Sequence, residues 1–78
     1  MAITYKKNMA VFEGVVSIED AEDLLAWLQK TPKARLDFSA CTHLHAANLQ
    51  VLMAARLPVA SWPHDNDLKA WLQSALRN

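Results

Sequence analysis

The sequence predicts a small α/β domain: a mixed, mostly parallel sheet of about four strands with three helices, in the order β-β-α-β-α-β-α. Two kinds of segment alternate along the chain. Short runs rich in β-branched and aromatic residues indicate strands, and longer segments with apolar residues at helical spacing indicate helices. Strands separated by helices favour parallel pairing through crossover connections. A chain of 78 residues has room for one core, so we expect residues 1–78 to form a single domain.

A β-hairpin is expected at the start of the chain. Ile3–Lys6 and Met9–Val16 are the two strands, because both are rich in residues that favour the pleated form. Lys7-Asn8 between them is suited to a tight turn. Gly14 inside the second strand indicates a bulge or the close approach of another backbone.

The first helix is expected to begin after Ser17, whose side chain is suited to an N-cap. Apolar residues then recur from Ile18 to Leu28 at the spacing of one helical face. The helix should end near Lys30, because Pro32 disfavours helical geometry in the residue before it.

The middle of the chain predicts a strand, a loop and a second helix. Arg35–Ser39 is short and alternating, as in a strand, and Ala40–His45 is less regular and is expected to be a loop. The helix that follows, from Ala46 to Arg56, is apolar nearly all round, so it is either deeply buried or covered in part by a partner. Pro58 ends it.

A short strand and a third helix complete the chain. Val59–Trp62 is the strand, and Asp65 is the expected cap of a helix that reaches Leu76. The first and third helices share the pattern Asp-Leu-x-Ala-Trp-Leu-Gln. We therefore expect Trp27 and Trp71 to play matching structural roles at the edges of their apolar faces.

Charge and hydropathy exclude several classes of function. Eight basic residues balance eight acidic ones, which gives no general attraction to nucleic acid or to an anionic membrane. The longest mostly apolar run, Leu49–Leu57, is far shorter than the ~20 residues that span a bilayer. The segment Met1–Met9 lacks the apolar core of a signal peptide. We expect a cytoplasmic protein.

Enzymatic chemistry finds little support in the residues. One glycine cannot build a phosphate-binding loop, and no pair of carboxylates has a spacing that suits general acid–base catalysis. Cys41 beside a histidine has no glycine-rich oxyanion turn to accompany it. We expect no enzyme activity and no cofactor.

The segment Arg35–Ala55 carries a family resemblance. Its sequence Arg-Leu-Asp-Phe-Ser-Ala-Cys-Thr-His-Leu-His-Ala-Ala-Asn-Leu resembles the central signature of STAS domains (sulphate-transporter and anti-sigma-factor-antagonist domains). In that family a Leu-Asp-Leu-Ser strand leads through a loop to an Asp-Ser-Ser-Gly-Leu turn and an apolar helix. The upstream hairpin, glycine and amphipathic helix are also similar. The resemblance covers roughly residues 9 to 57.

This chain departs from the family at the turn. His45, Ala46, Ala47 and Asn48 stand where the family carries Asp-Ser-Ser-Gly. Ala46 occupies the position of the serine that is phosphorylated in regulated members, and alanine has no hydroxyl to accept a phosphate. Asn48 replaces the glycine. Of the residues other than glycine, asparagine best tolerates a positive φ, so the turn is expected to survive.

The resemblance implies a STAS-like fold and a non-enzymatic protein–protein interaction module in bacterial signalling. Such a module is similar to an anti-sigma factor antagonist or a chemotaxis-associated adaptor, and its partner would be a kinase-like anti-sigma factor or a chemotaxis component. By resemblance, the partner-binding residues are Thr42, His43, His45, Ala46, Ala47, Asn48, Gln50 and Val51.

Charge depletion in the same segment gives independent support. The stretch Ala40–Gln50 contains no Asp, Glu, Lys or Arg, which is typical of the centre of an interface and equally of a loop that is simply well packed. Two other hypotheses stay open. One is a small metal- or thiol-responsive protein that uses Cys41, His43 and His45, since thiolate and imidazole bind zinc and copper. The other is a homodimer completed by the apolar helix.

Overall fold

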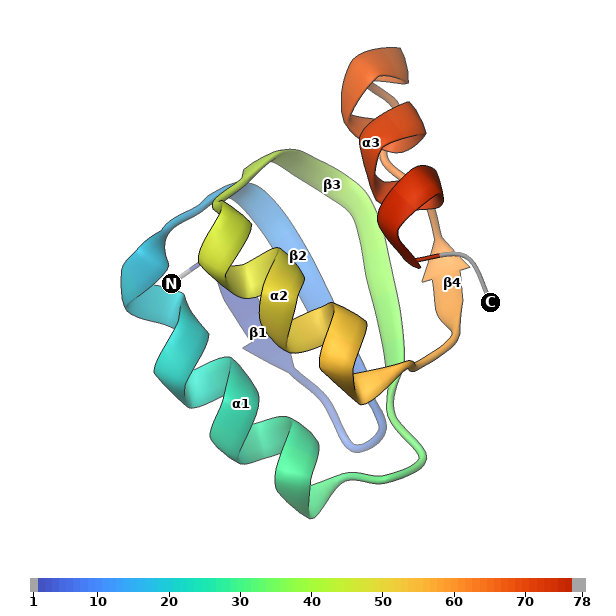
Figure 1. The fold of residues 1–78 in the computed structure, drawn as a ribbon. Helices are drawn as coiled ribbons and strands as arrows, with labels where there is room; N and C mark the ends of the chain where they lie inside the picture. Colours follow the sequence, from blue (N-terminus) through green and yellow to red (C-terminus); the bar gives the residue numbers. More distant parts are fainter. Residues whose placement is uncertain (1, 77–78) are drawn as a thin grey trace.

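The computed structural model describes residues 2–76 and contains a four-stranded sheet with three α-helices (Figure 1). The sheet order is β1-β2-β3-β4; β1 pairs with β2 antiparallel, and the other neighbours pair in parallel. The predicted fold class and element order are confirmed. The elements are β1 (Ile3–Tyr5), β2 (Met9–Val16), the 3-10 turn η1 (Ile18–Asp20), α1 (Ala21–Lys30), β3 (Arg35–Leu44), α2 (Ala46–Ala55), β4 (Val59–Ser61) and α3 (Asn66–Leu76).

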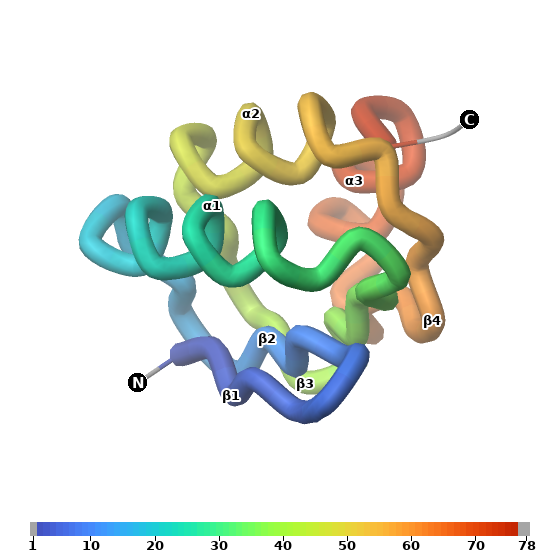
Figure 2. Tube along the Cα trace, turned by 90° about the horizontal axis from the view of Figure 1, so that it is seen from below, coloured from blue at the N-terminus to red at the C-terminus, as the bar shows by residue number. Residues whose placement is uncertain are grey.

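The helices α1 and α2 lie side by side over one face of the sheet, and α3 packs beside α2 near β3 and β4 (Figure 2). The core lies between the helices and this face. Phe12 of β2 stacks on Phe38 of β3 at its centre, with ring centroids 4.6 Å apart. Both rings are fully buried, as are Leu24, Leu52 and Leu72, one from each helix.

The third strand is longer than the sequence predicts. Ala40–His45 was expected to be a loop, but β3 continues to Leu44, so this prediction is wrong. The second half of β3 pairs with the second half of β2, where Glu13 lies opposite Ala40 and Val16 opposite Leu44. This pairing satisfies backbone groups that a loop would leave to water.

Gly14 adopts a positive φ of 65°, and the register of β2 against β3 shifts between Gly14 and Val15. The sequence predicts a bulge or a close backbone approach at Gly14. The structure shows an irregularity in the pairing at this glycine, with the extra residue, Thr42, on the facing strand β3, and nothing lies within 4 Å of a Cβ placed on Gly14. Glycine reaches this conformation without steric cost, which other residues do not.

The helix ends follow the local signals in the sequence. Asp65 accepts a hydrogen bond of 3.0 Å from the backbone N–H of Leu68, which confirms it as the cap of α3. The expected start of the first helix directly after Ser17 is wrong: Ile18–Asp20 form the 3-10 turn η1, and α1 begins at Ala21 with Asp20 as its N-cap. The helix ends at Lys30 as predicted. Among residues 2–76, no helix combines the length and apolar character needed to cross a membrane.

The two tryptophans of the shared helix pattern do not play matching roles. Trp27 is half-buried and packs against Tyr5, with ring centroids 5.1 Å apart. Trp71 leaves 41% of its surface exposed on α3. The reason is the sheet: β1 lies under α1, and α3 has no equivalent aromatic strand residue beside Trp71 among the contacts described.

Candidate functional site

The junction between β3 and α2 is held against the end of β2. The backbone N–H of His45 donates to the carbonyl of Val16 at 2.9 Å, and the side-chain amide of Asn48 donates to the carbonyl of Ser17 at 2.7 Å. The carboxyl ends of the parallel strands β2 and β3 thus lie side by side at the same end of the sheet. The start of α2 is fixed by bonds to a segment distant in sequence.

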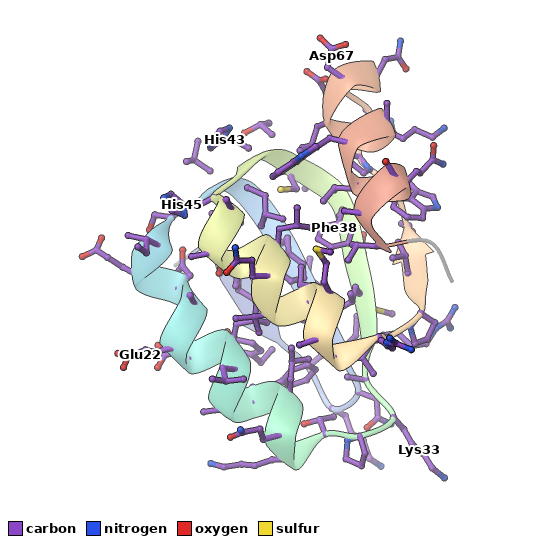
Figure 3. All side chains as sticks on the ribbon, viewed as in Figure 1. Glu22, Lys33, Phe38, His43, His45 and Asp67 are labelled. Atoms are coloured by element: carbon purple, nitrogen blue, oxygen red, sulfur yellow. The ribbon has the colours of Figure 1, made fainter. Side chains whose placement is uncertain are left out.

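His45 is the N-cap of α2. Its backbone is extended, with φ −67° and ψ 143°, and its Nδ1 accepts a hydrogen bond of 3.0 Å from the N–H of Ala47. The bond requires an imidazole whose Nδ1 carries no proton. The exposed ring therefore satisfies one of the free N–H groups of the first helical turn, at the end of the molecule where Figure 3 shows His43 and His45.

Asn48 lies inside α2 and is fully buried. Arg56 is the residue other than glycine that has a positive φ in the described chain, so the expectation that Asn48 supplies a left-handed turn is wrong. The helix begins before it, because His45 caps the chain at that point. Since the Ser17 carbonyl can only accept, Nδ2 of Asn48 must face it, and Oδ1 is the atom without a partner among the described residues.

Most of the expected partner-binding residues are accessible. Exposed positions are Thr42, His43, His45, Ala46 and Gln50; Ala47 and Val51 are half-buried. Asn48 is buried, so it orders this region and does not present its side chain to a partner. We call the exposed set, together with Met53 on the same side of α2, the β3–α2 surface.

Met53 was missed by sequence reasoning, although 47% of its surface is exposed. Its spacing supplies the signal: it follows Ala46 by seven residues and Gln50 by three, which places all three on one helical face. In a helix that is apolar nearly all round, the sequence alone does not say which face meets the sheet.

The β3–α2 surface carries no charge, because no Asp, Glu, Lys or Arg occurs from Ala40 to Ala55. Burial accounts for part of this stretch, since Cys41 and Leu44 belong to the core. It does not account for the consecutive exposed residues Thr42 and His43. The stretch is thus both packed on its inner side and open on its outer side.

The structure does not bring Cys41, His43 and His45 together as a ligand set. Cys41 is buried and its thiol donates to the carbonyl of His43 at 3.5 Å, whereas both imidazoles are exposed. Gly14 lies opposite Cys41 and Val15 opposite His43, so the bulge breaks the alternation that would aim the two side chains the same way. No group of three His, Cys, Asp or Glu residues within 2–76 is arranged to hold a metal ion.

Asp37, in the Leu-Asp-Phe-Ser strand, has a local structural partner. Its carboxylate accepts from the backbone N–H of Ser39 at 2.9 Å and from the Ser39 hydroxyl at 2.8 Å. These hydrogen bonds hold the pKa of Asp37 below its ordinary value. The register of β3 against β2 shifts at this point, so the carboxylate stabilises an irregularity in the strand.

Comparison with models of known protein families gives no match for this chain, and comparison with curated proteins gives none either. The structural features that bear on function are therefore the β3–α2 surface and the residues that hold it in place. A surface of fixed shape, exposed and free of charge is suited to contact with another protein.

Proposed function

We propose that this domain is a non-enzymatic protein-interaction module of bacterial signalling, which binds a partner protein through the β3–α2 surface. The observation that carries the proposal is the accessibility of an uncharged surface on α2 and the strand before it. Exposed charge is abundant in the first part of the chain, from Lys6 to Arg35, so the exposed uncharged residues of the β3–α2 surface contrast with it.

Preorganisation supports the same proposal. Two hydrogen bonds, from His45 to Val16 and from Asn48 to Ser17, fix the start of α2 before any partner arrives. His45 caps the helix in addition. A surface ordered in advance loses less conformational entropy on binding than a flexible one, which increases affinity for a given contact area.

The partner class rests on the resemblance to STAS domains. It favours a kinase-like anti-sigma factor or a chemotaxis component, with the start of α2 at the centre of the contact. Ala46 is exposed at the first position of α2, where regulated members of that family carry their phosphorylated serine. Without a hydroxyl at this position the domain cannot be switched by phosphorylation there, so it is competent to bind its partner at all times. The amount of the domain in the cell then sets how much partner is bound.

The test is capture of partners with an Ala46→Glu variant. Glutamate is compatible with the first turn of a helix, where its charge meets the positive end of the dipole, so the fold is retained. A carboxylate at the centre of the contact should reduce the amount of retained partner about tenfold or more. Ala70→Glu, the same change at an exposed position of α3, is the matched control and should retain the partner as wild type does.

Tagged wild type and both variants are incubated with lysate of the organism that encodes the chain, and retained proteins are quantified by mass spectrometry. A protein held by wild type and Ala70→Glu but lost from Ala46→Glu supports the proposal. Equal retention by both variants, or the absence of any retained protein, contradicts it.

A further inference from the structure

The charges of this chain are segregated although they sum to zero. Most basic side chains gather at one end of the molecule, which we call the basic end. The β1–β2 turn, the end of α1 and the start of β3 meet there, because the N–H of Arg35 donates to the carbonyl of Asn8 at 2.8 Å. The exposed basic residues of this end are Lys6, Lys7, Lys30, Lys33, Arg35 and Arg56.

The opposite end, which we call the acidic end, contains the second half of β2, η1 and the first turn of α1. Its exposed acidic residues are Glu13, Glu19, Glu22 and Asp23. Figure 3 shows Glu22 beside the N-terminal half of α1 and Lys33 beyond the C-terminal end of that helix. Acidic groups at helix starts and basic groups at helix ends also complement the helix dipoles.

An apolar groove opens between α1 and α2 towards the basic end. Its volume is about 360 Å³, and its apolar lining includes Leu25, Leu28, Val51, Ala54 and Leu57. This is room for two or three aliphatic side chains.

Basic residues adjoin the lining of the groove in the chain, and we call them its basic rim. Three of its lining residues, Gln29, Pro32 and Ala55, are each followed in the chain by an exposed basic residue. The entrance therefore favours an apolar group that carries negative charge around it.

The acidic end presents a group of that description. Val15 and Ile18 leave 63% and 58% of their surfaces exposed, the two largest values among the exposed large hydrophobic residues of the described chain. Glu13, Glu19 and Glu22 lie within four residues of one or the other. Val15 and Ile18, which we call the knob, lie in a stretch of the chain that carries acidic residues and no basic ones, and Glu13, Glu19 and Glu22 are its acidic rim. In apolar character and in charge, the knob complements the groove and its basic rim.

We propose that copies of this chain associate head to tail, with the knob of Val15 and Ile18 from one copy seated in the α1–α2 groove of the next. Charge complementarity selects a second copy as the occupant, because the chain itself carries both members of the pair at opposite ends. The contact is heterologous, so each pair leaves one knob and one groove free and can extend. The proposal is independent of the β3–α2 surface and its partner.

Sedimentation velocity over a range of protein concentrations tests this directly. The mean size of wild type should rise with concentration in about 20 mM NaCl, and the apparent Kd should weaken about tenfold or more in about 500 mM NaCl, because the rims are screened. Ile18→Asp removes the knob and Leu25→Asp blocks the groove. Both positions are exposed, so both variants should keep the fold, and circular dichroism checks this.

The decisive arm is the mixture. Each variant alone should be a monomer, whereas an equimolar mixture should form a one-to-one dimer, since Ile18→Asp retains an intact groove and Leu25→Asp an intact knob. A wild type that stays monomeric at low salt overturns the proposal. So does a closed dimer that Leu25→Asp abolishes but Ile18→Asp does not. A monomeric wild type whose groove binds the anionic apolar dye anilinonaphthalene sulfonate would assign the groove to a small ligand instead.

Discussion

The side-chain amide of Asn48 donates a hydrogen bond of 2.7 Å to the backbone carbonyl of Ser17, 31 positions earlier in the chain. The bond joins the first turn of α2 to the segment that leaves β2. Asn48 is fully buried, so this polar contact is made out of reach of competing water. The placement of the β3–α2 surface on the sheet therefore depends on a side chain that the surface does not expose.

Replacing Asn48 should lower stability by amounts that depend on the replacement. Asn48→Ala leaves the Ser17 carbonyl without its donor and opens a small cavity, so the free energy of unfolding should fall by about 2–3 kcal/mol. Asn48→Asp should cost more near neutral pH, because a carboxylate cannot donate and is buried. That extra cost should shrink as the pH falls and the carboxyl gains a proton.

Urea unfolding followed by tryptophan fluorescence measures both changes. Gln50→Ala, an exposed position two residues further along α2, is the control and should change stability by no more than about 0.5 kcal/mol. A loss for Asn48→Ala no larger than that of the control would show that the bond to Ser17 does not position α2.

Gly14 should tolerate asparagine better than alanine. Nothing lies within 4 Å of a Cβ placed on Gly14, so the cost of a substitution comes from its φ of 65° alone. Gly14→Ala should therefore cost about 1–2 kcal/mol, and Gly14→Asn less than half of that, because asparagine adopts the left-handed region more readily. Thermal unfolding compares the stabilities of the two variants. Equal losses of stability in Gly14→Ala and Gly14→Asn would contradict the claim that the positive φ of Gly14 determines the cost.

Tyr5 should titrate well above a free tyrosine. Burial raises its pKa from 10.0 to about 12, and the negative charges of Asp23 and Asp20 add to the effect. Tyr5 is the single tyrosine, so tyrosinate absorbance in the near ultraviolet reports on it alone. A native midpoint close to that of the urea-unfolded chain would contradict the packing of Tyr5 against Trp27.

The same shift predicts how stability depends on alkaline pH. The folded chain holds the Tyr5 proton more tightly than the unfolded chain, so protonated Tyr5 contributes to the free energy of unfolding. This contribution is fully present below about pH 10 and is lost as the pH rises towards about 12. Tyr5→Phe should flatten the dependence of unfolding free energy on pH over this interval.

Cys41 should be a slowly reacting thiol. Only 3% of its surface is exposed, and burial raises the pKa of the thiol, so little thiolate forms near pH 8. Alkylation by iodoacetamide should be about tenfold slower or more in the native protein than in urea. Equal rates would place a reactive thiol on the surface and revive the hypothesis of a thiol-responsive protein.

Local signals in the sequence predicted much of the fold. The strand Met9–Val16, the end of the first helix at Lys30 and the cap at Asp65 all depend on residues within a few positions of one another. Each of these features has its physical cause in the segment itself, as in turn, cap and helix-stop residues.

Features that depend on contacts between residues far apart in the sequence could not be predicted. The strand extends to Leu44 because the second half of β2 lies beside it, and Asn48 is buried because Ser17 lies opposite. The exposed face of α2, including Met53, was likewise decided by which side met the sheet. In the candidate site, the absence of charged residues was visible in the sequence, but the division between buried and exposed residues was not.

Site-specific photo-crosslinking tests most directly whether the β3–α2 surface binds a partner. A photoreactive phenylalanine derivative replaces Gln50 on α2 or, as the matched control, Gln73 on α3, since both are exposed glutamines on helices. We predict a discrete adduct in cells from the Gln50 position, none of the same mass from Gln73, and loss of the adduct when Ala46→Glu is added. The same adducts from both positions, or an adduct that survives Ala46→Glu, would contradict the proposed docking surface.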